Sequence, residues 1–188
     1  MDPYQVTLII LGTLCSALFF LVFTMLLRVY LRVRVELLVF FSFSFLLLAL
    51  GQVASALSII IDQPRLSLTL FTSSSSITSI GFLLMLFSLL RRGKEEALAV
   101  TVPLLLIAAP DVAAFALSLA ASMIIRGKHL KMYVMALSAS YLIRGFGSIL
   151  LPMGVGAYVL ITSELLKAIA TSLFAMYHLG KVTIHEEA

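Results

Sequence analysis

Long apolar runs separated by short polar segments divide this chain. An α-helix rises about 1.5 Å per residue, so a run of about 20 residues crosses the roughly 30 Å of hydrocarbon in a bilayer. Five runs are near or above that length, and we predict a transmembrane helix for each. These predicted helices are Val6–Leu27, Leu37–Ile61, Leu68–Leu90, Tyr133–Leu151 and Val155–Leu179.

The remaining apolar region, residues 97–125, permits two interpretations. One long helix gives six transmembrane helices in total, whereas two short helices, Glu95–Ala109 and Asp111–Ile125, give seven. Pro110 lacks an N–H and suits the first turn of a new helix, and Asp111 suits the positive end of a helix dipole. We therefore predict a helix break or gating position at Pro110 and Asp111. Each short helix is below the usual transmembrane length, which is the argument for the single helix.

The distribution of charge favours seven helices. Only 12% of the residues are charged and 62% are hydrophobic, which excludes a soluble domain with a polar shell. With seven helices three basic clusters lie on one side of the membrane, whereas with six helices the third cluster lies on the other side. Cytoplasmic loops are enriched in Lys and Arg, so we predict seven helices with the N-terminus outside and the C-terminus cytoplasmic. The clusters are Arg28, Arg32 and Arg34; Arg91, Arg92 and Lys94; and Arg126, Lys128 and Lys131.

Weak internal similarity supports the same interpretation. Residues 41–46 with Gly51 resemble residues 137–142 with Gly147, and two shorter matches occur in the same order. The offsets between matched residues are 90–98 positions, so the first three and the last three helices are predicted repeats. An intervening helix gives the two repeats the same orientation in the membrane.

We therefore predict an all-α fold, a polytopic membrane bundle of seven helices in a 3+1+3 parallel-repeat arrangement. Residues 1–188 form a single integral membrane domain, with repeat halves at 6–92 and 111–182 and a linker helix at 94–110. The alternative is six helices in a 3+3 inverted repeat.

This 3+1+3 plan resembles that of the SWEET and PQ-loop transporters and is also similar to that of the microbial rhodopsins. Microbial rhodopsins have a Lys in the middle of the last helix, and this chain has Lys167 there. They also have an Asp four residues earlier, where this chain has Ser163. The Pro-Gln dipeptide of the PQ-loop proteins is absent from the first and fifth helices, and the chain has no Trp. The resemblance is therefore one of architecture, and neither family is assigned.

Polar residues inside the predicted helices are the best indicators of function, because polar groups are costly to place in lipid. At about 1.5 Å per residue, Gln52, Arg144, Glu164 and a serine run all lie ~8–15 Å from the outer ends, with Lys167 one turn deeper. We expect Arg144 to pair with Glu164, because an unpaired buried charge costs several kcal/mol. The predicted ligand or transport site comprises Gln52, Ser73, Ser76, Ser140, Tyr141, Arg144, Glu164 and Lys167.

Structural roles account for some of the same residues. A buried Arg–Glu pair also fixes the register of two helices, and serines also allow helices to pack closely. No phosphate loop, catalytic triad or carboxylate pair can be assembled, and the three histidines are scattered at 129, 178 and 185. We therefore assign no enzymatic activity, cofactor or metal. The single cysteine, Cys15, excludes an internal disulfide.

Three functions fit these observations. The first is a small transporter or channel-like protein with a polar cavity in the outer half of the bundle, favouring an anionic or zwitterionic solute. The second is a non-catalytic subunit or scaffold of a larger membrane complex, and the third is a sensor with a chromophore or ligand linked to Lys167. The expected partners are the bilayer, anionic headgroups at the basic loops, and a second copy or another membrane protein. Nucleic acid is not expected, since positive-inside loops explain the net charge of +4.

Overall fold

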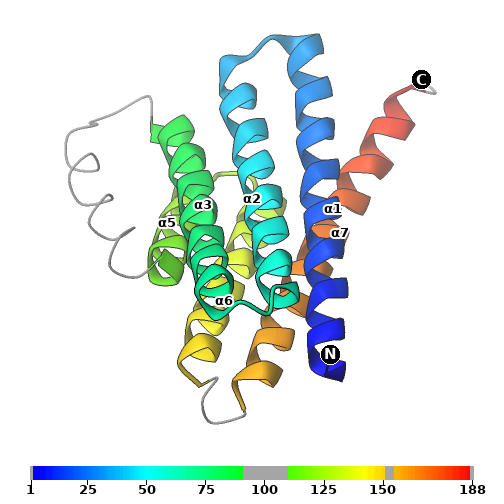
Figure 1. The fold of residues 1–188 in the computed structure, drawn as a ribbon. Coiled ribbons are helices and arrows are strands. Elements are labelled where there is room, and N and C mark those ends of the chain that lie inside the picture. Colours follow the sequence, from blue (N-terminus) through cyan, green and yellow to red (C-terminus); the bar gives the residue numbers. More distant parts are fainter. Residues whose placement is uncertain (1, 91–109, 151–154, 187–188) are drawn as a thin grey trace.

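The computed structural model describes residues 2–90, 110–150 and 155–186, and all regular structure in them is helical (Figure 1). Pro110, which the sequence predicts to lie in the first turn of a new helix, is the first described residue of a helix. The predicted linker helix at 94–110 lies outside the described residues, apart from Pro110. The described helices are α1 (Pro3–Val33), α2 (Glu36–Ile60), α3 (Pro64–Leu90), α5 (Pro110–Ile124), α6 (Lys128–Leu150) and α7 (Gly156–Glu186).

Local sequence signals set the ends of several helices. Asp2 precedes α1, and its backbone N–H donates to Gln5 Oε1 at 3.0 Å, which satisfies a backbone donor near the start of the helix. At the other end of α1, Arg34 adopts a left-handed conformation with φ 54°, and its N–H donates to the Tyr30 carbonyl at 2.7 Å. Pro64 and Pro110 each occupy the first position of a helix, where the missing N–H has no intrahelical partner to lose.

The six described helices form a ring. Each packs against two neighbours, in the order α1, α2, α3, α5, α6 and α7, and α7 returns to α1. Inside the ring lies a core of aromatic and aliphatic side chains, among which Phe19, Phe45, Phe82 and Tyr141 are fully buried. Aromatic contacts join different helices, for example Phe82 on α3 with Tyr141 on α6 at a centroid distance of 5.4 Å.

Neighbouring helices run in opposite directions except at two places. Asp111 at the start of α5 contacts Ser75 on α3, and the last residues of both helices line one cavity, so α3 and α5 are parallel. Likewise α1 contacts the first half of α7 through Cys15 and Glu164, and Leu26 and Phe174 line that same cavity farther along. The helices α1–α3 and α5–α7 are therefore two up-down-up units in the same orientation (Figure 1).

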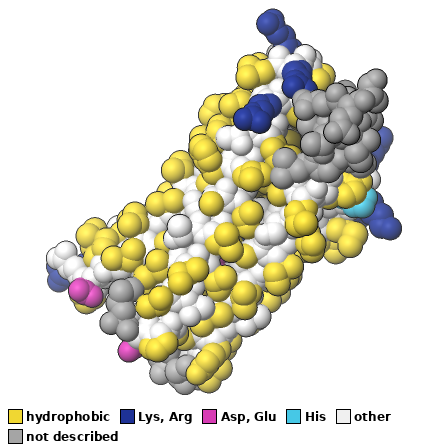
Figure 2. All heavy atoms as spheres, turned by 90° about the vertical axis from the view of Figure 1, so that its right-hand side faces the viewer, with side chains coloured by type: hydrophobic (Ala, Val, Ile, Leu, Met, Phe, Trp, Pro, Cys, Tyr) yellow, Lys and Arg dark blue, Asp and Glu magenta, His cyan; other side chains and the backbone are white. Residues whose placement is uncertain are grey.

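Length and composition indicate a membrane location. Four described helical segments are long and apolar enough to cross a bilayer: Pro3–Val33, Leu38–Ile60, Pro64–Leu89 and Gly156–His178. Figure 2 shows hydrophobic side chains covering the face between the two ends of the molecule, with charged side chains gathered at the ends. A large exposed apolar surface of this kind is typical of a protein surrounded by lipid.

The two ends of the ring differ in charge. Val35, after α1, and Arg126, after α5, line one cavity, so the turns that carry the first and third basic clusters lie at the same end. We call this the basic end. Tyr4 and Asp62 line a second cavity at the opposite end, which we call the Asp62 end. Acidic side chains are visible at that end in Figure 2.

Candidate functional site

A cluster of charged and polar side chains lies inside the ring, in the half toward the Asp62 end. Arg144 on α6 is 1% exposed, Lys167 on α7 is 0% exposed and Glu164 on α7 is 6% exposed. Gln52 on α2 is fully buried beside them. Gln52, Arg144 and Glu164, predicted at one depth, therefore lie in one interior region together with Lys167, which was predicted one turn deeper.

Lys167, Glu164 and Gln52 form one part of this cluster. Lys167 Nζ donates to Glu164 Oε1 at 2.5 Å, across one turn of α7. With its amide oxygen facing the lysine, Gln52 accepts from Lys167 Nζ at 2.7 Å and donates to Glu164 Oε2 at 3.3 Å. The opposite amide orientation would set oxygen against oxygen and nitrogen against nitrogen. Gln52 thus supplies the second acceptor for Lys167 and ties α2 to α7.

Arg144 belongs to the other part of the cluster. Its Nε lies 3.7 Å from Asp111 Oδ1, and its Nη2 donates to Ser74 Oγ at 2.7 Å. Asp111 also accepts a hydrogen bond from Ser75 Oγ at 2.7 Å. The expected pairing of Arg144 with Glu164 was wrong, because equal depth does not fix the direction in which two side chains point around their helix axes.

Charge is balanced within this cluster. Arg144 and Lys167 contribute two cations, and Asp111 and Glu164 contribute two carboxylates. The site residues predicted from the sequence include two bases and one acid, since Asp111 was predicted to belong to a helix break instead. The first turn of α5 lies against α3 and α6, and it brings the fourth charge into the site.

Aromatic rings lie under both cations. Lys167 Nζ is 4.9 Å from the centroid of the Tyr141 ring, and Arg144 Cζ is 4.8 Å from the centroid of the Phe71 ring. A cation over an aromatic face is favourable by about 0.5–2 kcal/mol, more when both groups are desolvated. The rings therefore help to hold two buried cations in fixed positions.

A cavity of about 640 Å³ leads from the Asp62 end to this cluster. Tyr4 and Asp62 line it near the helix ends, and Arg144 and Glu164 line it in the interior. Ser55, Ser58 and Ser67 add polar groups along its walls. This volume lies within the usual range for sites that hold small molecules.

Three buried polar atoms have no hydrogen-bond partner among the described residues: Arg144 Nη1, Tyr141 OH and Thr78 Oγ1. Such atoms are rare in folded proteins, because an unsatisfied buried donor costs about 1–3 kcal/mol. Arg144 is also one of the two cluster residues that line the cavity. Its guanidinium is therefore the group best placed to receive an acceptor that enters from the Asp62 end.

Two of the predicted serines lie outside the cluster. Ser73 and Ser76 are half-buried, and Ser76 Oγ donates to the carbonyl of Thr72 on its own helix. Their neighbours Ser74 and Ser75 were not among the predicted site residues. Ser74 contacts Arg144, and Ser75 contacts Asp111. The repeating positions 75, 78, 79 and 82 are the signal that could have identified the inward face of α3, because residues three and four apart share a helix face.

The remaining predicted residues pack in the interior or form hydrogen bonds between helices. Ser140 is buried, and its carbonyl accepts from Ser163 Oγ at 2.7 Å, which joins α6 to α7. The Pro110 carbonyl accepts from Ser79 Oγ at 2.7 Å, which joins the start of α5 to α3. Tyr141 lies fully buried between the aromatic core and Lys167.

Small residues bring α2 and α3 close together beside the cluster. A Cβ atom on Gly51 would lie 2.5 Å from Thr78 Oγ1 and 3.0 Å from the Ser74 carbonyl oxygen, so this contact requires glycine. In the part of the chain that the structure describes, no group of three or more His, Cys, Asp or Glu residues is placed to hold a metal ion. The site is therefore built from ion pairs, an amide and hydroxyl groups.

Comparison with known proteins adds one match. Residues 7–94 match the model of a family described as a family of unknown function, DUF5985. The matched segment includes almost all of α1 and the whole of α2 and α3. No curated protein and no solved structure matches the chain.

Proposed function

We propose that the protein is a small integral membrane transporter or channel-like protein, and that the cavity at the Asp62 end is its solute site. The observation that carries this proposal is Arg144, which lines the inner part of that cavity and has a buried Nη1 donor without a partner among the described residues. A structural arginine needs no access from the end of the bundle. A solute anchor needs both the access and the spare donor.

The chemistry of the site favours a small solute that carries a carboxylate. Arg144 Nη1 donates to one carboxylate oxygen, and an arginine–carboxylate hydrogen bond is stronger than one between neutral groups. Glu164 lines the same cavity and Asp111 pairs with Arg144, so an ammonium group on the solute also finds acceptors. The balanced charge of the cluster makes a zwitterion a better match than a simple anion.

In this proposal the complete fold has seven transmembrane helices in a 3+1+3 parallel repeat, with the N-terminus outside and the C-terminus cytoplasmic. The parallel orientation of α1–α3 and α5–α7 supports it, since an odd number of crossings must then separate the two units. The shared position of two basic turns at one end supports the orientation. The DUF5985 match supports a three-helix unit, because it ends close to the end of α3.

Uptake into proteoliposomes tests the proposal. The probes are radiolabelled glycine as a zwitterion, acetate as an anion and glycerol as a neutral solute. We expect glycine uptake above that of empty liposomes, and loss of most of it in Arg144→Gln. Arg65→Gln is the matched control, because Arg65 is exposed at the same end and does not line the cavity. Equal uptake by Arg144→Gln and Arg65→Gln proteoliposomes would overturn the proposal.

A non-catalytic subunit or scaffold is the second candidate. The observation that favours it is that residues of the cluster also link helices. Gln52 joins α2 to α7, and Asp111 joins α5 to α3 and α6. In that role the natural partner is another membrane protein or a second copy. A stable partner copurified from native membranes, together with no solute uptake, would favour this function.

A chromophore or ligand linked to Lys167 is the third candidate. Its amine is fully buried and engaged by both Glu164 and Gln52, so an aldehyde would have to displace these contacts. Incubation with retinal followed by borohydride reduction and mass measurement tests it. Unchanged mass and absence of colour would exclude this candidate.

A further inference from the structure

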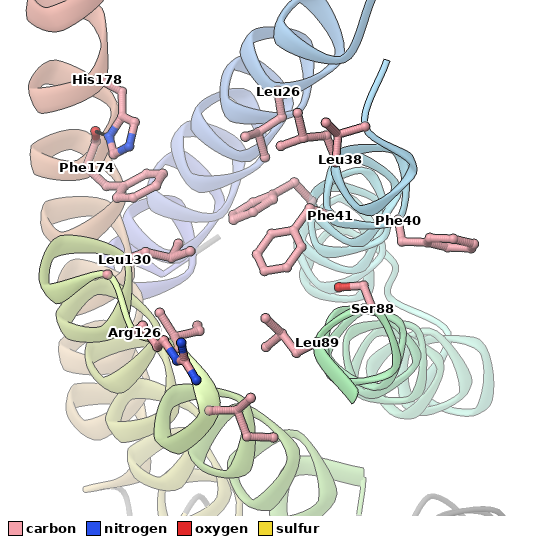
Figure 3. Close-up of a pocket in the computed structure, with 15 residues that line it drawn as sticks. Leu26, Leu38, Phe40, Phe41, Ser88, Leu89, Arg126, Leu130, Phe174 and His178 are labelled. Atoms are coloured by element: carbon pink, nitrogen blue, oxygen red, sulfur yellow. Dashed lines mark hydrogen bonds between the residues drawn. The ribbon is translucent and has the colours of Figure 1, made fainter. Parts of the chain in front are cut away.

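A second cavity, of about 960 Å³, opens inside the ring at the basic end (Figure 3). All six described helices contribute residues to its lining. Leu130 on α6 and Leu89 on α3 point toward it from opposite sides. It is distinct from the cavity at the Asp62 end, with which it shares no lining residue.

The walls of this cavity are mostly apolar. Leu26, Phe41, Leu130 and Phe174 are typical of the residues that line it. Such walls offer few partners to a hydrated solute, and they favour a ligand that loses apolar surface from water on entry. A hydrocarbon chain meets this requirement.

Aromatic rings stack on one another at the wall of this cavity. Tyr133 stacks on Phe174 at a centroid distance of 4.4 Å and on Phe45 at 6.0 Å. Both Phe45 and Phe174 line the cavity. Part of the cavity wall is therefore a stack of aromatic rings from α2, α6 and α7.

The mouth of the cavity is basic. Arg126, in the turn between α5 and α6, lines the cavity and is exposed. Lys128 and Lys131 follow within the next turn and are also exposed. His178 on α7 lines the same region, and its ring lies against Phe174 at a centroid distance of 4.2 Å. An anionic headgroup at this mouth can form a charge-assisted pair with Arg126.

We propose that this cavity binds a single-chain anionic amphiphile such as a fatty acid, with its acyl chain inside the ring and its carboxylate on Arg126. The apolar lining suits an acyl chain, and the guanidinium of Arg126 suits a single carboxylate. The site lies at the opposite end of the bundle from the proposed solute site. The proposal therefore does not depend on transport.

Fluorescence quenching tests this site, because the chain has no Trp and an introduced Trp is the sole such fluorophore. Phe174→Trp places the probe in the cavity. Leu173→Trp is the matched control at the same depth, since Leu173 is 63% exposed on the outer surface of α7. The full-length protein is reconstituted in phosphatidylcholine vesicles, and dibrominated stearic acid is added as the quencher.

We expect the brominated acid to quench the Phe174→Trp variant saturably, and its uncharged methyl ester to quench the same variant more weakly. Addition of Arg126→Gln should raise the acid concentration for half-maximal quenching by about tenfold, since a hydrogen bond to a charged group contributes about that factor. Addition of Lys131→Gln, in the same basic cluster but outside the cavity lining, should leave that concentration unchanged. The Leu173→Trp variant should be quenched without saturation and without dependence on Arg126.

Three results would overturn the proposal. The first is equal quenching of the Phe174→Trp and Leu173→Trp variants. The second is equal quenching of Phe174→Trp by acid and ester in the presence of Arg126. The third is stronger quenching of Phe174→Trp by brominated phosphatidylglycerol than by the acid, which would make a bilayer phospholipid the ligand. If Phe174→Trp does not fold, Leu130→Trp probes the same cavity from α6, with Met132→Trp as its exposed counterpart.

Discussion

Asp111 and Arg144 form an ion pair inside the helix ring, with 3.7 Å between Asp111 Oδ1 and Arg144 Nε. Asp111 stands in the first turn of α5, where the helix dipole favours a negative charge, and it also accepts from Ser75. One carboxylate therefore joins the start of α5 to both α3 and α6. The arginine it holds is the same residue that lines the cavity at the Asp62 end.

Loss of this carboxylate should destabilise the protein. Asp111→Asn keeps the shape of the side chain but leaves the buried Arg144 without its anion, and we expect the free energy of unfolding to fall by roughly 2–4 kcal/mol. Denaturant titration in mixed micelles measures this change. The double variant Asp111→Asn/Arg144→Met should recover part of the loss, because it no longer buries an unpaired charge.

The control for this prediction is Asp62→Asn. Asp62 is exposed in the turn between α2 and α3, so its substitution should change the free energy of unfolding by less than about 0.5 kcal/mol. If Asp111→Asn lowers the free energy of unfolding no more than Asp62→Asn does, the ion pair between Asp111 and Arg144 does not stabilise the fold as we infer.

Lys167 and Glu164 should behave as a coupled pair. Lys167→Met leaves the buried Glu164 carboxylate without its cation, and we expect the free energy of unfolding to fall by about 3 kcal/mol. The double variant Lys167→Met/Glu164→Gln should restore stability to within about 1 kcal/mol of the natural chain, because a neutral amide can hydrogen-bond to Gln52. Thermal unfolding of the purified protein in detergent measures both effects.

Lys131→Met provides the comparison for the Lys167 variants. It removes one lysine from an exposed position on α6 and should leave the unfolding temperature nearly unchanged. Independent, additive losses from Lys167→Met and Glu164→Gln would contradict the coupling between the two residues.

The sequence predicted the helices and the depth of the polar residues more reliably than the contacts between them. Depth follows from counting residues along a helix, so Gln52, Arg144, Glu164 and Lys167 were brought to one region. The direction of a side chain depends on rotation about the helix axis, which advances about 100° with each residue and is fixed by packing. The partner of Arg144 is therefore Asp111 rather than Glu164.

The serine run also shows that the sequence does not predict the direction in which a side chain points. Four consecutive serines point in four directions, and composition does not reveal which of them face the interior. Packing of α3 against both α2 and α5 turns Ser74 and Ser75 inward and leaves Ser73 and Ser76 half-buried. Charge sorting along the chain does not depend on rotation about a helix axis, and the turns after α1 and α5 lie at the same end of the ring.

Cysteine labelling should distinguish seven helices from six. On a Cys15→Ser background, Arg34→Cys and Lys128→Cys should react with a membrane-impermeant maleimide from the same side of sealed vesicles. Asp62→Cys should react from the other side, because the α2–α3 turn lies at the opposite end of the ring. Ser at position 15 keeps a small side chain that can still donate to the Glu164 carbonyl.

All three labelling positions are exposed, so unequal reactivity would report sidedness rather than burial. Reaction after the vesicles are permeabilised with detergent serves as the control for total labelling. Labelling of position 128 together with position 62, and opposite to position 34, would contradict the parallel arrangement of α3 and α5. It would favour the six-helix inverted repeat.

Gly51 should be far less tolerant of substitution than a second glycine in the same ring. In Gly51→Ala the new Cβ would lie 2.5 Å from Thr78 Oγ1 and 3.0 Å from the Ser74 carbonyl oxygen, so α2 must move away from α3. We expect a loss of about 1–3 kcal/mol, as for other overpacked positions. Gly12→Ala is the matched control, because its Cβ meets Ala56 Cβ at an ordinary 3.5 Å and alanine favours the helix.

The Gly51 substitution also links packing to the site. Ser74, which accepts from Arg144 Nη2, belongs to the segment of α3 that the new methyl group would displace. Gly51→Ala should therefore lower both glycine uptake and the free energy of unfolding. The double variant Thr78→Ser/Gly51→Ala should restore little of either, because the Ser74 carbonyl oxygen remains 3.0 Å from the added Cβ. Normal uptake by a destabilised Gly51→Ala protein would show that the α2–α3 contact supports the fold without positioning Arg144.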